Sequence, residues 1–230
     1  ALLERLPETL DVDPQQNYEI AVARAQSEGA LRGRLGPYQT VADHLLAVVP
    51  KGGHPWVRDV TISNSTFGNR YVQFAAPHLG VHALGGGIGQ GIAMAVGAAI
   101  ASPDARAVTL MGDGGAMLGI AELITAVDEG ANVTFVLMND AAYGVIENIQ
   151  DAQYEGRRHY SKLKTPNFAK LCDAIDLPHS KVTEITAFAE IFDAAMQRDG
   201  PSLVEVDMVA IGPFAESFAG PPAGAAGKTE

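Results

Sequence analysis

The stretch that decides the fold is MGDGGAMLGIAELITAVDEGANVTFVLMNDAAYGVI, residues 111–146. Two apolar, β-branched runs, 105–111 and 132–138, are separated here by a segment with apolar residues at helical spacing. Strands that are apolar on both faces are typical of a parallel sheet covered by helices on both sides. Each run is followed by a carboxylate, Asp113 in a GDG triplet and Asp140 in an Asn-Asp pair. The carboxyl ends of two buried strands are therefore predicted to carry acidic groups.

Strands and helices alternate along the rest of the chain in the same way. This alternation predicts an α/β fold, a doubly wound, mostly parallel sheet with helices on both faces. We expect strands at 55–62, 80–84, 105–111, 132–138 and 202–208, and helices at 36–50, 85–101, 116–130, 168–175 and 187–198. Residues 1–35 are polar and helix-prone, and are predicted to be a linker or arm from a preceding domain; residues 36–210 form the domain, and residues 211–230 a flexible C-terminal tail.

Composition excludes several classes of partner. The 27 acidic and 16 basic residues give a net charge of -11, which argues against nucleic acid and against an anionic membrane surface. The apolar stretch 88–100 is too short to span a bilayer. A single cysteine, Cys172, rules out an intrachain disulfide and is compatible with a reducing cytoplasm, where we expect the protein to lie.

Four polar or glycine-rich clusters fall at predicted strand ends: 63–66, 85–91, 112–115 and 139–143. Ligands of open parallel sheets bind at such ends, so these clusters predict one crevice. Glycines 112, 114 and 115 would leave backbone amides open to an anion at a helix start. Asp113 would repel a phosphate there unless a cation lay between them, which predicts a hard divalent ion, most simply Mg²⁺, bridging carboxylates and a diphosphate. The alternative is that Asp113 only caps the following helix.

Two other phosphate-binding motifs are excluded by their spacing. A dinucleotide fingerprint G-x-G-x-x-G fits no register of GGGIGQG, because the last position is Gln90 when it starts at Gly85 and Ile92 when it starts at Gly87. The chain also contains no G-x-x-x-x-G-K-[ST] sequence, which excludes a P-loop.

The GDG triplet, with an Asn-containing pair following it and a glycine cluster upstream, resembles the signature of thiamine diphosphate enzymes. Asp140 of the pair lies 27 positions after Asp113. The resemblance runs from about residue 57 to residue 208. It is to the C-terminal diphosphate-binding domain of the 2-oxoacid decarboxylase and acetolactate synthase branch, with benzoylformate decarboxylase similar in pattern around GGIG and YG.

The resemblance implies a metal site. Asp113 and Asp140 would ligate Mg²⁺ through their carboxylates, and Ala142 through its backbone carbonyl. Asn139 matches the first residue of the pair and is expected to support the turn. Asp140 is a departure, because the family has asparagine there. The additional negative charge should tighten the metal site and weaken diphosphate binding slightly.

The resemblance also implies the cofactor contacts. Ile88 would wedge thiamine diphosphate into a bent shape, and the carbonyl of Gly86 would accept a hydrogen bond from its aminopyrimidine. His82 could touch the substrate as a catalytic group, or be a half-buried structural histidine. The complete set of predicted cofactor contacts is Thr66, Gly86, Ile88, Gly112, Gly114, Gly115, Asn139, Tyr143 and Gly144.

By this resemblance we expect a decarboxylase or carboligase acting on a 2-oxoacid. The alternatives are an enzyme using the same cofactor on acyl-CoA or diketone substrates, and a non-catalytic cofactor-binding subunit that scaffolds a partner. The family takes a glutamate for the cofactor from a separate pyrimidine-binding domain, and no second α/β domain fits in 230 residues. We therefore expect that domain in the same longer polypeptide or in a partner subunit, and a homodimer or tetramer in the full enzyme.

Overall fold

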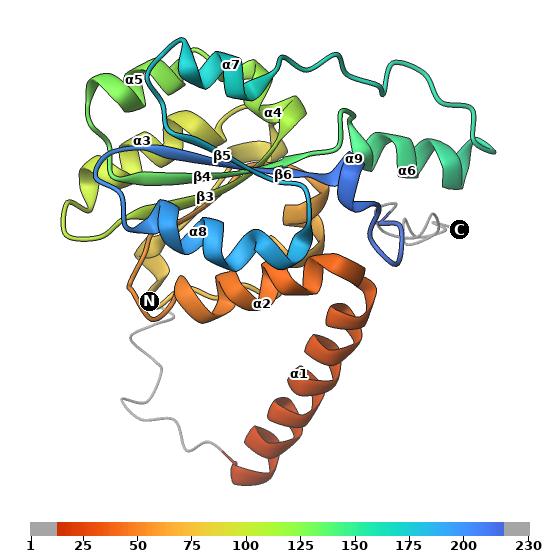
Figure 1. Cartoon of the computed structure of the whole chain (residues 1–230). Coiled ribbons are helices and arrows are strands. Elements are labelled where there is room, and N and C mark those ends of the chain that lie inside the picture. Colours follow the sequence, from red (N-terminus) through yellow and green to blue (C-terminus); the bar gives the residue numbers. More distant parts are fainter. Residues whose placement is uncertain (1–12, 219–230) are drawn as a thin grey trace.

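The computed structural model describes residues 13–218 of the chain. One sheet contains six strands: β1 (Trp56–Arg58), β2 (Gly80–His82), β3 (Ala107–Gly112), β4 (Val133–Asn139), β5 (His179–Val182) and β6 (Ser202–Asp207). Their order is β2-β1-β3-β4-β6-β5, and every pairing is parallel. The predicted fold class is confirmed (Figure 1).

Helices cover both faces of the sheet, because β3 and β4 are apolar on both sides. On one face α2 (Gln39–Val48) and α8 (Phe188–Met196) pack in one core cluster. On the other, α3 (Gly91–Ala101), α5 (Glu122–Asp128) and α7 (Phe168–Asp173) pack in a second cluster (Figure 1). The remaining α-helices of the described chain are α1 (Pro14–Arg34), α4 (Asp113–Leu118), α6 (Gly144–Gln153) and α9 (Met208–Ile211).

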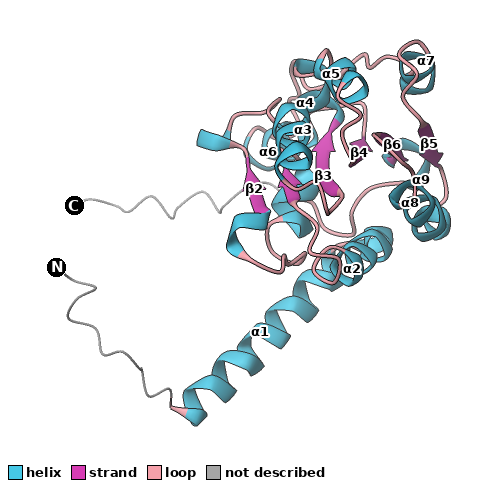
Figure 2. Cartoon of the chain, turned by 90° about the vertical axis from the view of Figure 1, so that its left-hand side faces the viewer, coloured by secondary structure: helices cyan, strands magenta, loops and turns pink. Residues whose placement is uncertain are grey.

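The first helix, α1, extends away from the sheet (Figure 2). Asp13 caps it by accepting from the amide of Gln15, and none of its residues is buried. A bidentate contact from Arg32 to Asp43 connects its last turn to α2. Among residues 13–218, no helix has both the length and the apolar character needed to cross a membrane.

The order of the strands positions the crevice. From β1 the chain moves outward to β2, and then returns to place β3 on the other side of β1. The segment after β1 packs on the face that holds α2, and the segment after β3 packs on the face that holds α3. β1 and β3 are neighbours in the sheet, and the connections that follow them pack on opposite faces. In a parallel sheet such an arrangement leaves a crevice for a ligand beyond the carboxyl ends of the two strands.

Several boundaries differ from the prediction. The strand expected at 55–62 ends at Arg58, and the chain enters a helical turn, Asn64–Gly68, whose Phe67 is buried. The helix expected at 116–130 divides at Gly119 into α4 and α5. A Cβ at Gly119 would lie 2.8 Å from the carbonyl oxygen of Gly89, so this close approach of two backbones requires glycine.

The described C-terminal segment stays attached to the core: Phe218 packs against the core cluster and its carbonyl oxygen accepts from Asn148 Nδ2 at 3.1 Å, and Phe214 is part of that cluster. Its ring is buried and its centroid lies 4.5 Å from that of Tyr38. Residues 219–230 of the predicted flexible tail lie outside the described residues. The boundaries predicted at 35 and 210 therefore stay predictions, and Leu35 is itself fully buried.

Candidate functional site

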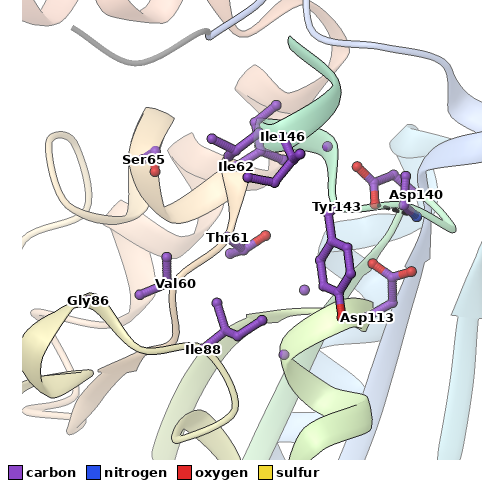
Figure 3. Close-up of a pocket in the computed structure, with 16 residues that line it drawn as sticks. Val60, Thr61, Ile62, Ser65, Gly86, Ile88, Asp113, Asp140, Tyr143 and Ile146 are labelled. Carbon is purple, nitrogen blue, oxygen red and sulfur yellow. Dashed lines mark hydrogen bonds between the residues drawn. The ribbon is translucent and has the colours of Figure 1, made fainter. Parts of the chain in front are cut away.

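A cavity of about 280 Å³ lies beyond the carboxyl ends of β1, β3 and β4, at the crevice that the strand order opens (Figure 3). Loops from all three strand ends and the glycine segment before α3 contribute to its wall. The residues that line it are Val60, Thr61, Ile62, Ser65, Gly86, Ile88, Gly112, Asp113, Gly114, Gly115, Asp140, Ala142, Tyr143, Gly144, Val145 and Ile146.

Most residues predicted for the site meet at this cavity. Both predicted carboxylate ligands, Asp113 and Asp140, lie close together on one side of it, near the Tyr143 ring (Figure 3). The predicted site residues that line the cavity are Gly86, Ile88, Gly112, Asp113, Gly114, Gly115, Asp140, Ala142, Tyr143 and Gly144. Three predicted residues do not line it: Thr66, His82 and Asn139.

Each of the three has other partners. The Thr66 hydroxyl donates to the carbonyl oxygens of Ile62 and Ser63 inside its helical turn, at 2.9 and 3.0 Å. The ring of His82 is half-buried on β2, with Nδ1 3.1 Å from the carbonyl oxygen of Arg58. His82 therefore lies outside the cavity wall, and its role as a catalytic or a structural histidine stays a prediction. The hydroxyl-bearing residues of this segment that line the cavity are Thr61 and Ser65, and the contact predicted for Thr66 stays a prediction.

Two carboxyl groups, the buried Asp113 and the half-buried Asp140, share one side of the cavity. Asp113 is 1% exposed, and its Oδ2 has no hydrogen-bond partner among the described residues. Burial, and then the charge of Asp140, raise the pKa of Asp113 to about 7. Burial likewise raises the pKa of Asp140. Such a pair is costly without a cation, because each ionised group opposes the other in a low-dielectric setting.

Three glycines at the cavity, Gly114, Gly115 and Gly144, have no room for a side chain. A Cβ at Gly114 would lie 2.5 Å from the Tyr143 ring, and one at Gly115 would lie 2.7 Å from Asp59 Oδ2. At Gly144 a Cβ would collide with Asp140 Oδ2. At these three positions no side chain covers the backbone next to the two carboxylates, so a ligand could approach the backbone closely there.

The turn between β4 and α6 is held by its own side chains. Asn139 Oδ1 accepts from the amide of Ala141 and Asp140 Oδ1 from that of Ala142, each at 3.2 Å. Ala141 has a φ of 53°, which is unusual for a residue with a Cβ. Ala142 forms a β-bridge with Lys162, and this bridge fixes the backbone beside the carboxylates.

Asp59, which the sequence analysis did not identify, fixes the position of the glycine segment at the cavity wall. It follows β1, is 1% exposed, and accepts from the amide of Gly89 with both oxygens, at 3.0 and 3.2 Å. The side-chain amide of Gln90 also stabilises this segment. It accepts from the backbone amide of Leu84 and donates to the carbonyl oxygens of Leu84 and Gly87. Together Asp59 and Gln90 hold the glycine segment that carries Ile88 into the cavity.

The donor set fits a divalent cation and a diphosphate. In the described part of the chain, no group of three or more His, Cys, Asp or Glu side chains could hold a metal ion. A pair of carboxylates with a free buried oxygen nevertheless suits Mg²⁺, which usually completes its shell with water, a carbonyl or phosphate oxygens. Fold and site together define a diphosphate-binding α/β domain.

Comparison with known proteins agrees with that class. Residues 61–206 match the family described as "Thiamine pyrophosphate enzyme, C-terminal TPP binding domain". The chain belongs to this family, and it is the thiamine diphosphate-binding domain of an acetolactate synthase- or decarboxylase-like protein.

The relatives are longer than this chain. It is 31% identical over 121 residues to the mitochondrial acetolactate synthase catalytic subunit of Aspergillus candidus, covering 53% of this chain and 17% of the relative. It is 32% identical over 122 residues to the acetolactate synthase large subunit of Lactococcus lactis, covering 53% and 21%. A solved structure, the thiamine diphosphate-dependent 4-hydroxybenzoylformate decarboxylase of Rhodococcus jostii, superimposes with a TM-score of 0.67 at 26% identity, covering 74% of this chain and 32% of that one. The chain thus spans about a fifth of the curated relatives.

Proposed function

We propose that this domain binds Mg²⁺ and thiamine diphosphate for a decarboxylase or carboligase that acts on 2-oxoacids. The observation that carries the proposal is the pairing of buried Asp113 with half-buried Asp140 on a glycine-lined cavity, with Asp113 Oδ2 lacking a partner among the described residues. A cation between these carboxylates would remove their repulsion and would attract a diphosphate.

Each wall of the cavity has a role in the proposal. Asp113, Asp140 and the carbonyl of Ala142 would hold Mg²⁺, and the bare backbone at Gly114 and Gly115 would receive the diphosphate. Ile88, whose segment is fixed by Asp59, would support the bent shape of the cofactor. The chemistry that the bound cofactor supplies is a carbon nucleophile and an electron sink for decarboxylation.

The apolar part of the cavity supports a 2-oxoacid with an apolar substituent. Val60, Ile62 and Ile146 line it; in Figure 3 Val60 lies on the side away from the two carboxylates, and Ile62 and Ile146 lie together next to the start of α6. A pocket of this kind binds an apolar group by burial, while the polar carboxyl of the substrate is left for groups outside this wall. The named activity of the Rhodococcus jostii structure is consistent with such a substrate.

The proposal also requires a partner for the open side of the cavity. Leu84 and Leu118, which are 82% and 63% exposed, lie on the two segments that lead to and from it. Apolar side chains at a site are usually covered by another surface. We propose that a pyrimidine-binding domain, from the same longer polypeptide or from a partner subunit of a cytoplasmic homodimer or tetramer, covers this side.

Activity of the complete enzyme tests the function. We expect CO₂ release from pyruvate or benzoylformate with thiamine diphosphate and Mg²⁺, and a loss of more than about 100-fold in Asp113→Ala, because the metal contributes several kcal/mol. Glu122→Gln, at the first position of α5 and outside the cavity, is the control that should retain activity.

Three outcomes would contradict the proposal in different ways. If the enzyme turned over acyl-CoA or diketone substrates but no 2-oxoacid, the proposed substrate class would be wrong. Cofactor binding without any turnover would indicate a scaffolding subunit. Unchanged CO₂ release in Asp113→Ala would remove the metal pair from the mechanism.

A further inference from the structure

A buried polar chain lies behind the β4–α6 turn, outside the cavity. Glu205 on β6 is 3% exposed and accepts from Asn139 Nδ2 at 2.8 Å and from His179 Nε2 at 2.9 Å. Neither Glu205 nor His179 lines the cavity. Burying a carboxylate is costly, so a buried position on an interior strand with two hydrogen-bond donors directed at it calls for a reason.

The chain continues from Asn139 into the turn that carries Asp140. Asn139 Oδ1 accepts from the amide of Ala141, whose φ of 53° is in the left-handed region. That conformation costs a residue with a Cβ about 1–2 kcal/mol, so it persists only where the surroundings hold it. Asp140, directly before Ala141, is the carboxylate that this turn presents to the cavity.

Glu205 determines which way the Asn139 amide faces. An asparagine amide can rotate to exchange its oxygen and nitrogen, and only one orientation lets Oδ1 accept from Ala141. An ionised carboxylate accepts hydrogen bonds and donates none, so Glu205 selects the orientation with Nδ2 toward itself. His179 holds the other oxygen of Glu205 in place.

We propose that Glu205 and His179 are positioning residues that act through Asn139 to hold Ala141 left-handed and Asp140 at the metal site. The surrounding charges support this role. Burial opposes ionisation of Glu205, but His179, Asn139 and Lys181 outweigh it and lower the pKa of the carboxyl. Cys172 on the covering helix α7 stays a neutral thiol, because burial and then the charge of Glu205 raise its pKa to about 11.

A double-mutant cycle on the complete enzyme tests the proposal, which rests on the proposed function. The readout is the Mg²⁺ concentration needed for half-maximal thiamine diphosphate binding, measured by calorimetry, with thermal stability recorded separately. Glu205→Met should weaken Mg²⁺ by about 10-fold, as loss of a group that orients a metal ligand commonly does. In an Ala141→Gly background, where glycine adopts the left-handed conformation freely, the same change should cost less than about 3-fold.

The controls separate positioning from general stability. Lys181→Met removes the 3.5 Å ion pair to Glu205 and the 2.8 Å pair to Asp207, but leaves in place the His179 and Asn139 hydrogen bonds, which lower the pKa of Glu205 more than the charge of Lys181 does, and should change Mg²⁺ affinity by less than about 2-fold. If Glu205→Met does not fold, Asn139→Ala removes the tether itself and gives the same cycle with Ala141→Gly. Equal losses in the alanine and glycine backgrounds would overturn the positioning role.

Failure of this inference differs from failure of the proposed function. If Asp113→Ala abolishes the Mg²⁺ dependence but the cycle is additive, only the role of Glu205 and His179 is lost. If Asp113→Ala leaves the Mg²⁺ dependence unchanged, the metal site itself is wrong.

Discussion

At the scale of single residues, Asp113 is a carboxyl group whose burial is costly in the absence of a cation. Its pKa of about 7 follows from burial and from the neighbouring charge of Asp140. A metal ion would reverse both effects, since it favours the ionised forms of the two carboxyls. Protons and the metal ion should therefore compete for these two carboxyl groups.

The metal-free enzyme should lose stability as the pH rises from about 4 to about 7. In that window the unfolded Asp113, with an ordinary pKa of 3.8, is ionised, while the folded one with a pKa of about 7 still holds its proton. The free energy of unfolding then falls with pH, by on the order of a few kcal/mol in total, and levels off above pH 7. Urea unfolding at pH 5 and pH 8, without and with Mg²⁺, measures this.

Asp113→Asn supplies the matched control, because it keeps the shape of the side chain and removes the titration. Its stability should vary less across the same window, and the stabilisation by Mg²⁺ that grows with pH in the wild type should be absent. The same pH slope in both proteins would mean that another group is responsible.

The sequence predicted individual site residues where the residue type is itself informative. Asp113 and Asp140 follow apolar strands, and the structure places both at one cavity. The sequence could not show whether Ser65 or Thr66 faces the cavity, because this depends on how the short helical turn that contains both residues is rotated. Asp59 was missed because it lay inside a segment interpreted as a continuous strand.

At the scale of elements, three segments depend on one another around Asp59. The end of β1, the glycine segment before α3, and α4 meet where Asp59 accepts from Gly89. Gly115 at the start of α4 leaves the space that the Asp59 carboxyl occupies. A side chain at Gly115 would therefore disturb the segment that carries Ile88.

Gly115→Ala should weaken thiamine diphosphate binding by about 10-fold and lower the stability by about 1–3 kcal/mol, because its Cβ would lie 2.7 Å from Asp59 Oδ2. Gly97→Ala is the control, since a Cβ there meets nothing within 4 Å on the exposed side of α3. That change should leave affinity unchanged and stabilise the helix by about 0.5–1 kcal/mol. Calorimetric titration and thermal unfolding measure both, and equal affinities in the two variants would contradict the role of this contact.

Elements were predictable where their burial is uniform. Strands β3 and β4 are buried along nearly their whole length, so their apolar runs identified them. Strand β5 was not predicted, because it is an edge strand of four residues, HSKV, with only Val182 buried. Such a strand has no apolar run to distinguish it from a loop. The contacts of Glu205 with His179 and Asn139 were hidden for a related reason, since they join three strands distant in sequence.

At the scale of the whole molecule, the strand order makes the site. The chain reverses direction across the sheet between β2 and β3, and the cavity opens at that reversal. The sequence predicted the α/β class and the clusters at the strand ends, but the order of the strands depends on packing that no local pattern encodes. The domain matches the thiamine diphosphate-binding family over residues 61–206, and we propose that another domain completes the site.

The central claim is that Asp113 and Asp140 hold the cation through which this domain binds thiamine diphosphate. Calorimetric titration of thiamine diphosphate into the complete enzyme, with and without Mg²⁺, tests it most directly. We expect binding by the wild type only when Mg²⁺ is present, loss of that binding in Asp113→Ala, and retention in Asp140→Asn, where an amide oxygen still reaches the metal. Equal affinity in the wild type and Asp113→Ala, or wild-type binding that does not depend on Mg²⁺, would contradict the claim.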